Sequence, residues 1–167
     1  YGTLNNILVD KRQVYFQYAS KKGSRIIEAW IKHLLFCASG KGGETYCIIG
    51  KYIKKIFYKI YPFISVLEAK DKLNILLQLY SSGMTKPLPF FPKTSFIYAD
   101  NEKNKMSAAC AEFAGASGIN DGLGELDDPY ISLCFDESVI EGDEFKSCAH
   151  TVFYDFWNAE MHSKRQA

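Results

Sequence analysis

The stretch GSRIIEAWIKHLLFCASGKGGETYCIIG, residues 23–50, decides the fold class of this chain. Apolar side chains recur at intervals of three and four between Ile26 and Ala38, which is the period of an amphipathic helix. Gly40 follows, and glycine commonly ends a helix. The turn GKGGE then leads into TYCIIG, residues 45–50, whose β-branched and aromatic residues predict a strand. A helix followed by a strand is therefore expected here.

The flanking sequence extends this alternation towards both ends. Residues 7–19 and the segment KYIKKIFYKIY, residues 51–61, are rich in β-branched and aromatic residues and predict further strands, the second ended by Pro62. Ser65 is placed to cap the next helix, and Glu68 three residues later completes a capping box.

The remaining sequence is more ambiguous. We interpret TSFIYA, residues 94–99, as a short strand, residues 103–114 as a helix and residues 115–128 as a loop. PYISLCF, residues 129–135, reads as a strand or a buried extended segment, and Asp143 caps a last helix with a wide apolar stripe. Together these elements predict an α/β fold, a mixed sheet flanked by helices.

Length and composition suit one folded domain. The chain has 167 residues, of which 47% are hydrophobic and 23% charged, so disorder is excluded. No apolar run is long enough to span a bilayer. Because the first residue is Tyr1 rather than Met, we expect residues 1–167 to be a single domain cut from a longer chain. Five cysteines without a CxxC pair fit a reducing cytoplasm better than a disulfide or zinc scaffold.

Charge is distributed unevenly although the net charge is only +1. Residues 1–70 carry twelve basic and four acidic side chains, whereas residues 71–167 carry eight basic and fifteen acidic ones. Residues 121–144 hold nine acids and no base. This asymmetry fits one face for a polyanion and another for a different partner, or two halves that neutralise each other across the fold.

Three segments, in this order and spacing, carry a resemblance to a known family. They are EAWIKHLLFCASG (residues 28–40), LYSSGMTKPLPFFPKTSFIY (79–98) and DDPYISLCFDE (127–137). Together they resemble the C-terminal domain of the exodeoxyribonuclease V gamma chain, the RecC subunit of the RecBCD helicase–nuclease. The string GM-x-x-PLP-x-x-PKT, within the second segment, is the most specific element.

The resemblance implies both a fold and a function. RecC-like proteins end in a degenerate restriction-endonuclease-like domain, that is, a PD-(D/E)xK nuclease-like fold that lacks the catalytic residues. The complete complex unwinds double-strand DNA ends, degrades DNA with ATP and serves recombinational repair in the cytoplasm. The implied partners are the beta (RecB-like) and alpha (RecD-like) subunits, double-strand DNA ends and unwound single strands. No cofactor is expected in this domain, since Mg and ATP are used by the partner subunits.

The loss of catalysis can be argued from the residues themselves. A PD-(D/E)xK nuclease holds Mg²⁺ with carboxylates at strand ends, and an acidic-x-Lys triplet is part of the site. Two triplets occur, 68–70 and 144–146, and each falls in the first turn of a predicted helix, where Glu68 and Glu144 have structural roles. We therefore predict no catalytic residue and no metal site. The alternative is an active Mg-dependent PD-(D/E)xK-type DNA nuclease.

The segment KYIKKIFYKIY is the best candidate for nucleic-acid contact. Lysines neutralise phosphates, and interleaved rings offer stacking platforms for unpaired bases. The candidate DNA-binding residues are Lys51, Lys54, Lys55, Lys59 and Tyr58. The competing interpretation is an edge strand with a solvated lysine face and a buried aromatic face.

Candidate partner-docking residues lie in the second half of the chain. Asp127 and Asp128 belong to the acidic stretch, which would meet a basic patch on another subunit or form a solvated loop. Phe90 and Phe91 lie between prolines and would anchor an interface or pack beneath the connector. The expected function is a non-catalytic DNA-handling and subunit-docking domain of a RecBCD-type complex.

Overall fold

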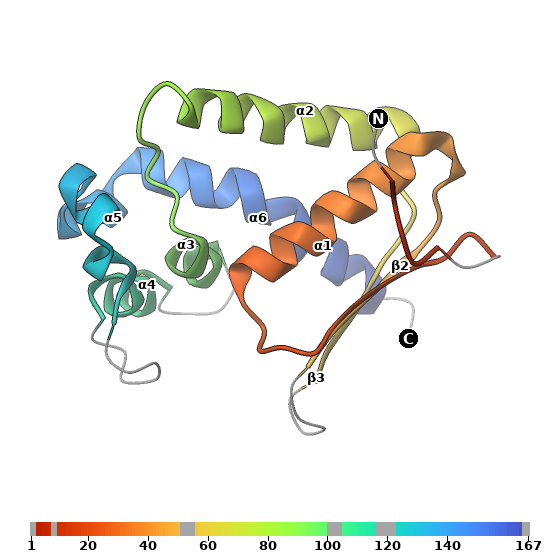
Figure 1. Cartoon of the computed structure of the whole chain (residues 1–167), viewed down its shortest axis with the longest axis horizontal. Helices are drawn as coiled ribbons and strands as arrows, with labels where there is room; N and C mark the ends of the chain where they lie inside the picture. The colour runs from red at the N-terminus through yellow and green to blue at the C-terminus, as the bar shows by residue number, and fades with distance from the viewer. Residues whose placement is uncertain (1–2, 8–9, 51–55, 100–104, 116–122, 165–167) are drawn as a thin grey trace. The chain divides into compact units, whose positions relative to one another are not determined.

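The computed structural model describes residues 3–7, 10–50, 56–99, 105–115 and 123–164 (Figure 1). Side chains are described as far as Phe156. The chain forms two compact units, which we treat separately. Unit 1 comprises Tyr1–Leu77 and Asn158–Ala167, and unit 2 comprises Gln78–Trp157. Among the described residues, no helix has the length and apolar character needed to cross a membrane.

Unit 1 is built on a three-stranded mixed sheet. Its elements are β1 (Gln13–Gln17), α1 (Gly23–Phe36), η1 (Cys37–Lys41), β2 (Thr45–Gly50), β3 (Ile56–Tyr61) and the first part of α2 (Val66–Gly83). The strand order is β1-β2-β3, with β1 parallel and β3 antiparallel to β2. The predicted α/β class, mixed sheet and strand at residues 45–50 are thereby confirmed.

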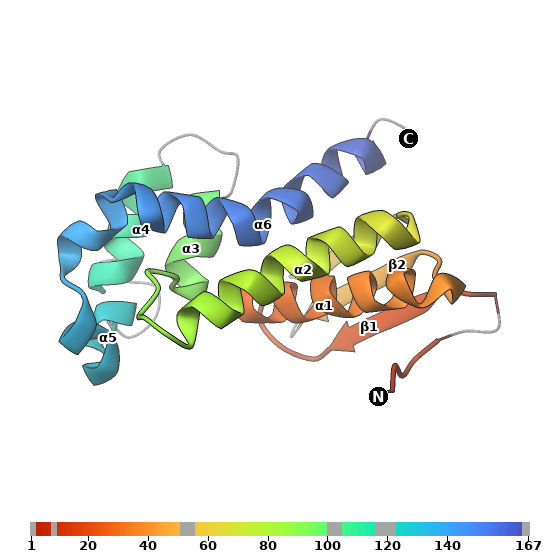
Figure 2. The same ribbon diagram turned by 90° about the horizontal axis from the view of Figure 1, so that it is seen from above.

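α1 is the connection that makes the parallel pair possible, since parallel neighbours need a long crossover. It runs alongside the strands (Figure 2) and buries the side chains of Ile26, Ala29, Trp30, His33, Leu34 and Phe36. The helix continues into the π-helical turn η1, where Gly40 adopts a positive φ of 73° that favours glycine. The predicted helix and its glycine end are therefore confirmed.

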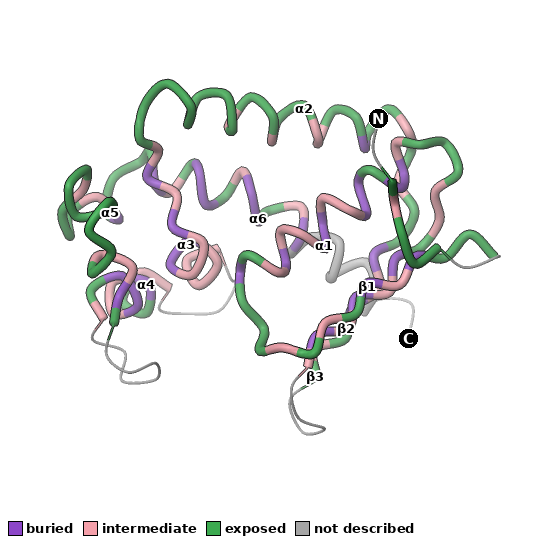
Figure 3. The backbone as a smooth tube through the Cα atoms, in the orientation of Figure 1, coloured by how far each residue is buried: buried purple, intermediate pink, exposed green. Residues whose placement is uncertain are grey.

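The two faces of the sheet differ in burial (Figure 3). Residues on the helix side are aligned by the register, Tyr15 with Cys47 and Cys47 with Lys59, and all three are buried. On this side His33 Nδ1 lies 2.9 Å from Thr45 Oγ1, and the Thr45 hydroxyl lies 3.2 Å from Gln13 Oε1. The core of unit 1 is thus apolar with a buried hydrogen-bonded line from α1 to β2 to β1.

α2 begins as predicted. The Glu68 amide donates to Ser65 Oγ at 3.2 Å, so Ser65 caps the helix. Within α2 Ala69 is the buried residue, whereas the large side chains of Leu77 and Tyr80 are exposed.

Unit 2 is helical in its described residues. Its elements are the end of α2, α3 (Pro92–Ala99), α4 (Lys105–Ala114), η3 (Glu125–Asp127), α5 (Pro129–Cys134), η4 (Glu137–Glu141) and the part of α6 (Asp143–Lys164) that ends at Trp157. α3 and α4 lie side by side (Figure 2). The core contains Phe91, Phe113, Ile140, Phe145 and Ala149.

Two predicted extended segments are helices in the structure. TSFIYA, residues 94–99, lies within α3, because Pro92 starts that helix and the Glu125 carboxylate accepts hydrogen bonds from the amides of Lys93 and Thr94. PYISLCF, residues 129–135, contains α5, which Asp128 caps by accepting the Tyr130 amide at 2.9 Å. The strand interpretations of both segments are wrong.

Candidate nucleic-acid interface

The side of the sheet that faces away from α1 is apolar and aromatic. We call it the open sheet face; it consists of Val14, Phe16, Tyr46, Ile48, Ile56, Tyr58 and Ile60. Every one of these side chains is exposed or half-buried. The exposed fractions reach 62% for Phe16 and 54% for Tyr58, so their rings are accessible to a flat ligand.

The strand register lines up the rings. Phe16, Ile48 and Tyr58 are neighbours across the three strands. Tyr46 lies on the same face of β2, two residues before Ile48. The ring centroids of Tyr46 and Tyr58 are 6.4 Å apart and tilted by 46°. This arrangement offers aromatic platforms on adjacent strands, as sheets that bind unpaired bases do.

A cation borders the open sheet face. The Arg12 guanidinium lies 5.7 Å from the centroid of the Tyr46 ring, within cation–π range. Arg12 also pairs with Asp10, and this contact lowers the pKa of the Asp10 carboxyl and raises the pKa of the guanidinium. The group is exposed and stays charged at every physiological pH.

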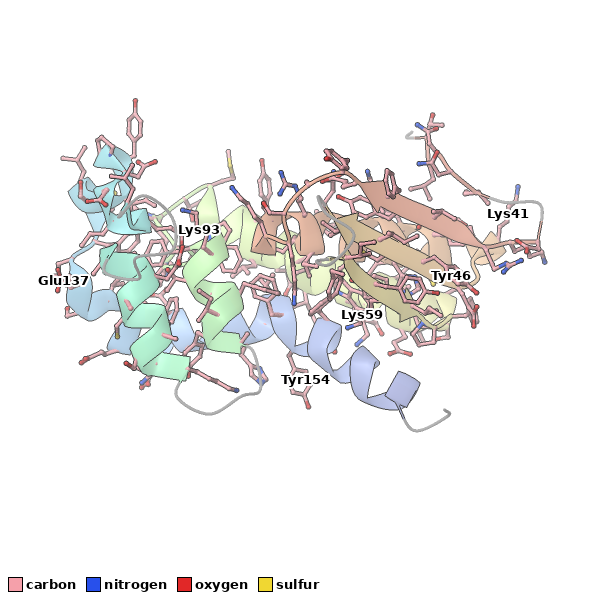
Figure 4. The ribbon with its side chains drawn as sticks, turned by 90° about the horizontal axis from the view of Figure 1, so that it is seen from below. Lys41, Tyr46, Lys59, Lys93, Glu137 and Tyr154 are labelled. Carbon is pink, nitrogen blue, oxygen red and sulfur yellow. The ribbon has the colours of Figure 1, made fainter. Side chains whose placement is uncertain are left out.

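The predicted DNA-binding residues do not all lie on this face. Tyr58 does, whereas Lys59 is only 5% exposed and belongs to the helix side, its ammonium nitrogen 5.3 Å from the Tyr61 ring centroid (Figure 4). Lys51, Lys54 and Lys55 lie outside the described residues. Alternation along β3 separates Tyr58 from Lys59, since successive strand residues point to opposite faces.

Three residues on or beside the open sheet face were not predicted from the sequence. Phe16, Tyr46 and Arg12 come from or directly precede strands that the pattern did predict. The missing signal was the register, because Tyr46 and Tyr58 become neighbours only once β2 and β3 are paired. A two-residue alternation in QVYFQ, residues 13–17, would have placed Phe16 opposite the buried Tyr15.

The predicted docking residues occupy different environments in unit 2. Phe91 is buried in the core, its ring centroid 4.5 Å from that of Phe113, so it offers no surface to a partner in this fold. Phe90 is half-buried against Phe153. Asp127 and Asp128 are exposed, and they accept hydrogen bonds from the backbone amides of Gly124 and Tyr130 respectively.

Both acidic-x-Lys triplets are in first helical turns, as the sequence predicted. Glu68 pairs with Lys72 on α2 at 3.5 Å, and the Glu144 carboxylate on α6 lies 2.6 Å from Lys86 Nζ. In the described ranges no three His, Cys, Asp or Glu side chains form a group that would hold a metal ion. Neither triplet thus lies at the end of a sheet strand.

A Cys–His pair is buried at the C-terminal end of α1, but its protonation states are unsuited to nucleophilic catalysis. Cys37 Sγ lies 3.7 Å from His33 Nε2. Burial lowers the pKa of His33 to about 4 and raises the pKa of the Cys37 thiol. At neutral pH the pair is therefore a neutral imidazole and a protonated thiol, and the thiolate is the nucleophilic form.

The comparison with protein families shows the family to which the chain belongs. A family model described as the RecC C-terminal domain matches residues 1–103, which include the whole sheet together with α1, α2 and α3. The chain belongs to the RecC C-terminal domain family and is part of a RecBCD-type complex. The segment 127–137, one of the three that carry the resemblance, lies beyond the match. No curated protein matched the chain.

Proposed function

We propose that this chain is a non-catalytic DNA-handling and subunit-docking domain of a RecBCD-type exodeoxyribonuclease V, with a degenerate nuclease-like fold. The family match supports membership of the complex. The observation that carries the DNA-handling role is the open sheet face, where Phe16 and Tyr58 are exposed, Tyr46 is half-buried beside Tyr58, and Arg12 lies at the border.

The chemistry of this face favours unwound single strands over duplex ends. Bases in a duplex are stacked on each other, so their flat faces are unavailable to protein rings, whereas unpaired bases stack freely on Tyr and Phe. Arginine adds a charge for phosphate and a flat group for stacking. Three accessible rings suffice to hold a short run of bases without sequence preference.

The non-catalytic part of the proposal rests on the two triplets. Glu68 and Glu144 each have a lysine partner on or beside a helix, and Glu68 belongs to a helix start capped by Ser65. In this proposal ATP and Mg²⁺ act in the RecB-like and RecD-like partner subunits, and this domain guides strands in the cytoplasmic complex.

The test is binding of a fluorescein-labelled 20-nucleotide oligothymidylate and of a matched duplex to the 167-residue chain, followed by anisotropy. We expect tighter binding of the single strand. Phe16→Ala and Tyr58→Ala should each weaken it by roughly 5- to 150-fold, because one stacked base contributes about 1–3 kcal/mol. Tyr80→Ala removes a tyrosine of α2 that is 68% exposed, more than Tyr58, and should leave the affinity unchanged. Equal losses in all three variants would contradict the assignment.

The active-nuclease alternative makes an opposite prediction. It requires Mg²⁺-dependent cleavage by the isolated chain that disappears in Glu68→Ala or Glu144→Ala. The proposal predicts that both variants bind the oligothymidylate like the parent chain, and that any DNA degradation by the assembled complex survives both changes. Cleavage lost in either variant would overturn the non-catalytic part and leave the DNA-binding part standing.

A further inference from the structure

The helix α5 presents large apolar side chains to solvent. Tyr130 and Leu133 are 81% and 82% exposed, and three residues apart they lie on one face of the helix. Cys134 beside them is exposed too. We call Tyr130, Leu133 and Cys134 the α5 surface. Isolated apolar residues on a surface are ordinary, but a paired Tyr and Leu on one helical face offer a compact anchor.

The opposite side of α5 is fixed to the core of unit 2. Ile131 and Phe135 pack against the cluster of Phe91, Phe113 and Phe145. The helix start is fixed as well, with Pro129 in its first turn and Asp128 as its cap. Tyr130 and Leu133 are therefore held outward by a rigid element, so little conformational entropy is lost when a partner covers them.

Acidic residues flank α5 in the sequence on both sides. Asp127 and Asp128 directly precede the helix, and the exposed Glu137 (Figure 4) follows Cys134 by three residues, which limits their Cα separation to about 11 Å. Within the part of unit 2 that the structure describes, Glu137 and Glu141 form no hydrogen bond or ion pair. Both carboxylates are therefore available to the cations of a partner.

We propose that the α5 surface docks a basic amphipathic segment of a partner subunit, with Tyr130 and Leu133 entering its apolar side and the flanking carboxylates facing its lysines and arginines. This inference rests on the subunit-docking part of the proposed function and adds the residues and the chemistry of the partner. Charge complementarity selects the occupant, because Asp127, Asp128, Glu137 and Glu141 are exposed and have no lysine or arginine partner among the described residues, whereas Asp143 and Glu144 are paired with lysines.

The first experiment is co-expression of the tagged 167-residue chain with the RecB-like and RecD-like subunits, followed by capture and measurement of the dissociation constant. The double variant Tyr130→Ser/Leu133→Ser should weaken the complex at least tenfold. The matched control, Tyr18→Ser/Leu67→Ser, changes the same residue types in unit 1, where both side chains are 71% exposed, and should bind like the parent. Circular dichroism and urea unfolding verify that each variant is folded.

The charge of the partner is tested separately. Glu137→Lys should weaken capture and remove much of its salt dependence between 0.1 and about 0.5 M NaCl, since screening acts on the same attraction. Asp71→Lys makes the same charge change at an exposed position of α2 and should have little effect. A carbodiimide cross-link from Glu137 or Glu141 to a partner lysine, located by mass spectrometry, identifies the docked segment.

The reactivity of the Cys134 thiol reports whether a partner covers the α5 surface, without any substitution at the contact. Its thiol is exposed, whereas Cys37, Cys47 and Cys148 are buried. Alkylation of Cys134 by iodoacetamide should slow at least fivefold in the complex. If the parent chain captures neither subunit, the proposed docking function fails and this inference with it. If capture occurs but survives the double variant, Glu137→Lys and full alkylation, only the assignment of the docking site to α5 is overturned. The same assignment is overturned if a second copy of this chain covers α5.

Discussion

At the scale of single residues, the buried polar line through His33 is the feature with the clearest consequence. His33 is fully buried between α1 and the sheet, next to Thr45, and its ring stacks 5.3 Å from that of Tyr61. Burial holds its pKa at about 4, below the ordinary value of 6.5. A neutral imidazole is therefore built into the core of unit 1.

This depressed pKa predicts a pH dependence of stability. Between pH 6.5 and 4 the unfolded chain binds a proton at His33 and the folded chain does not. The contribution of the neutral His33 to the free energy of unfolding is therefore fully present above pH 6.5 and is lost as the pH falls to 4. The expected size is roughly 3 kcal/mol. Urea unfolding of the parent and of His33→Gln, measured at pH 4.5 and 7.5, should show a steeper loss at low pH in the parent.

Histidine substitution elsewhere is the control for that difference. His150 on α6 is exposed, so His150→Gln should leave the pH dependence of unfolding as it is in the parent. All carboxyl groups are the same in the three proteins, and their contribution therefore cancels in the comparison. Parallel curves for the parent and His33→Gln would show that His33 is not the group responsible.

The sequence identified candidate residue types for the sites, but not the faces of the fold on which they lie. The lysines of KYIKKIFYKIY suggested nucleic-acid contact, and Tyr58 does lie on the open sheet face. Lys59 is buried on the other face, and Phe91, which the connector made a docking candidate, is in the core. Composition and spacing identify residue types, but the face on which a side chain lies depends on register and packing partners.

At the scale of elements, α3 shows how a distant residue selects a helix. The carboxylate of Glu125 accepts the amides of Lys93 at 3.1 Å and Thr94 at 2.8 Å, which satisfies two donors at the helix start. The chain before Glu125 passes close to the backbone of Phe113, and only glycine fits at position 124, because a Cβ there would lie 2.1 Å from the Phe113 carbonyl oxygen. We infer that α3 depends on η3 for its first turn.

Removing this cap should destabilise unit 2. Glu125→Ala leaves two partly buried amides without their acceptor, and we expect the free energy of unfolding to fall by about 1–3 kcal/mol. Glu125→Gln retains an amide oxygen and should lose less. Glu137→Ala, at an exposed acid of η4, should stay within about 0.5 kcal/mol of the parent. Urea unfolding followed at 222 nm measures all three, and equal stability of Glu125→Ala and Glu137→Ala would contradict the cap.

Elements with a local sequence signal could be predicted, and an element that depends on a distant contact could not. Strand β2 and helix α1 follow from local pattern, and the start of α2 follows from Ser65 and Glu68 three residues apart. TSFIYA has the residues of a strand, and its helical state depends on a carboxylate about thirty residues later in the chain. No local window contains that information. PYISLCF did carry a local signal, Asp128-Pro129 at the helix start, which the strand interpretation overlooked.

At the scale of the whole molecule, the chain forms two compact units, each with its own aromatic core. Trp30, His33 and Tyr61 pack together in unit 1, whereas Phe91 packs against Phe113, Phe135 and Phe145 in unit 2. The uneven charge seen in the sequence follows this division, with most bases in unit 1 and most acids in unit 2. A single cooperative domain over residues 1–167 remains a prediction from length alone.

The two cores allow that prediction to be tested with one substitution. Phe91→Ala removes a buried ring from unit 2 and should lower its free energy of unfolding by about 3–5 kcal/mol. If the units unfold separately, hydrogen exchange should accelerate in peptides from α4 while the β2 amides keep the protection they have in the parent.

Phe63→Ala removes an exposed ring in unit 1 and should accelerate neither set of amides. Equal loss of protection in β2 and α4 of Phe91→Ala would instead show that both cores unfold together, as a single domain requires, because local opening would then cost as much as global unfolding.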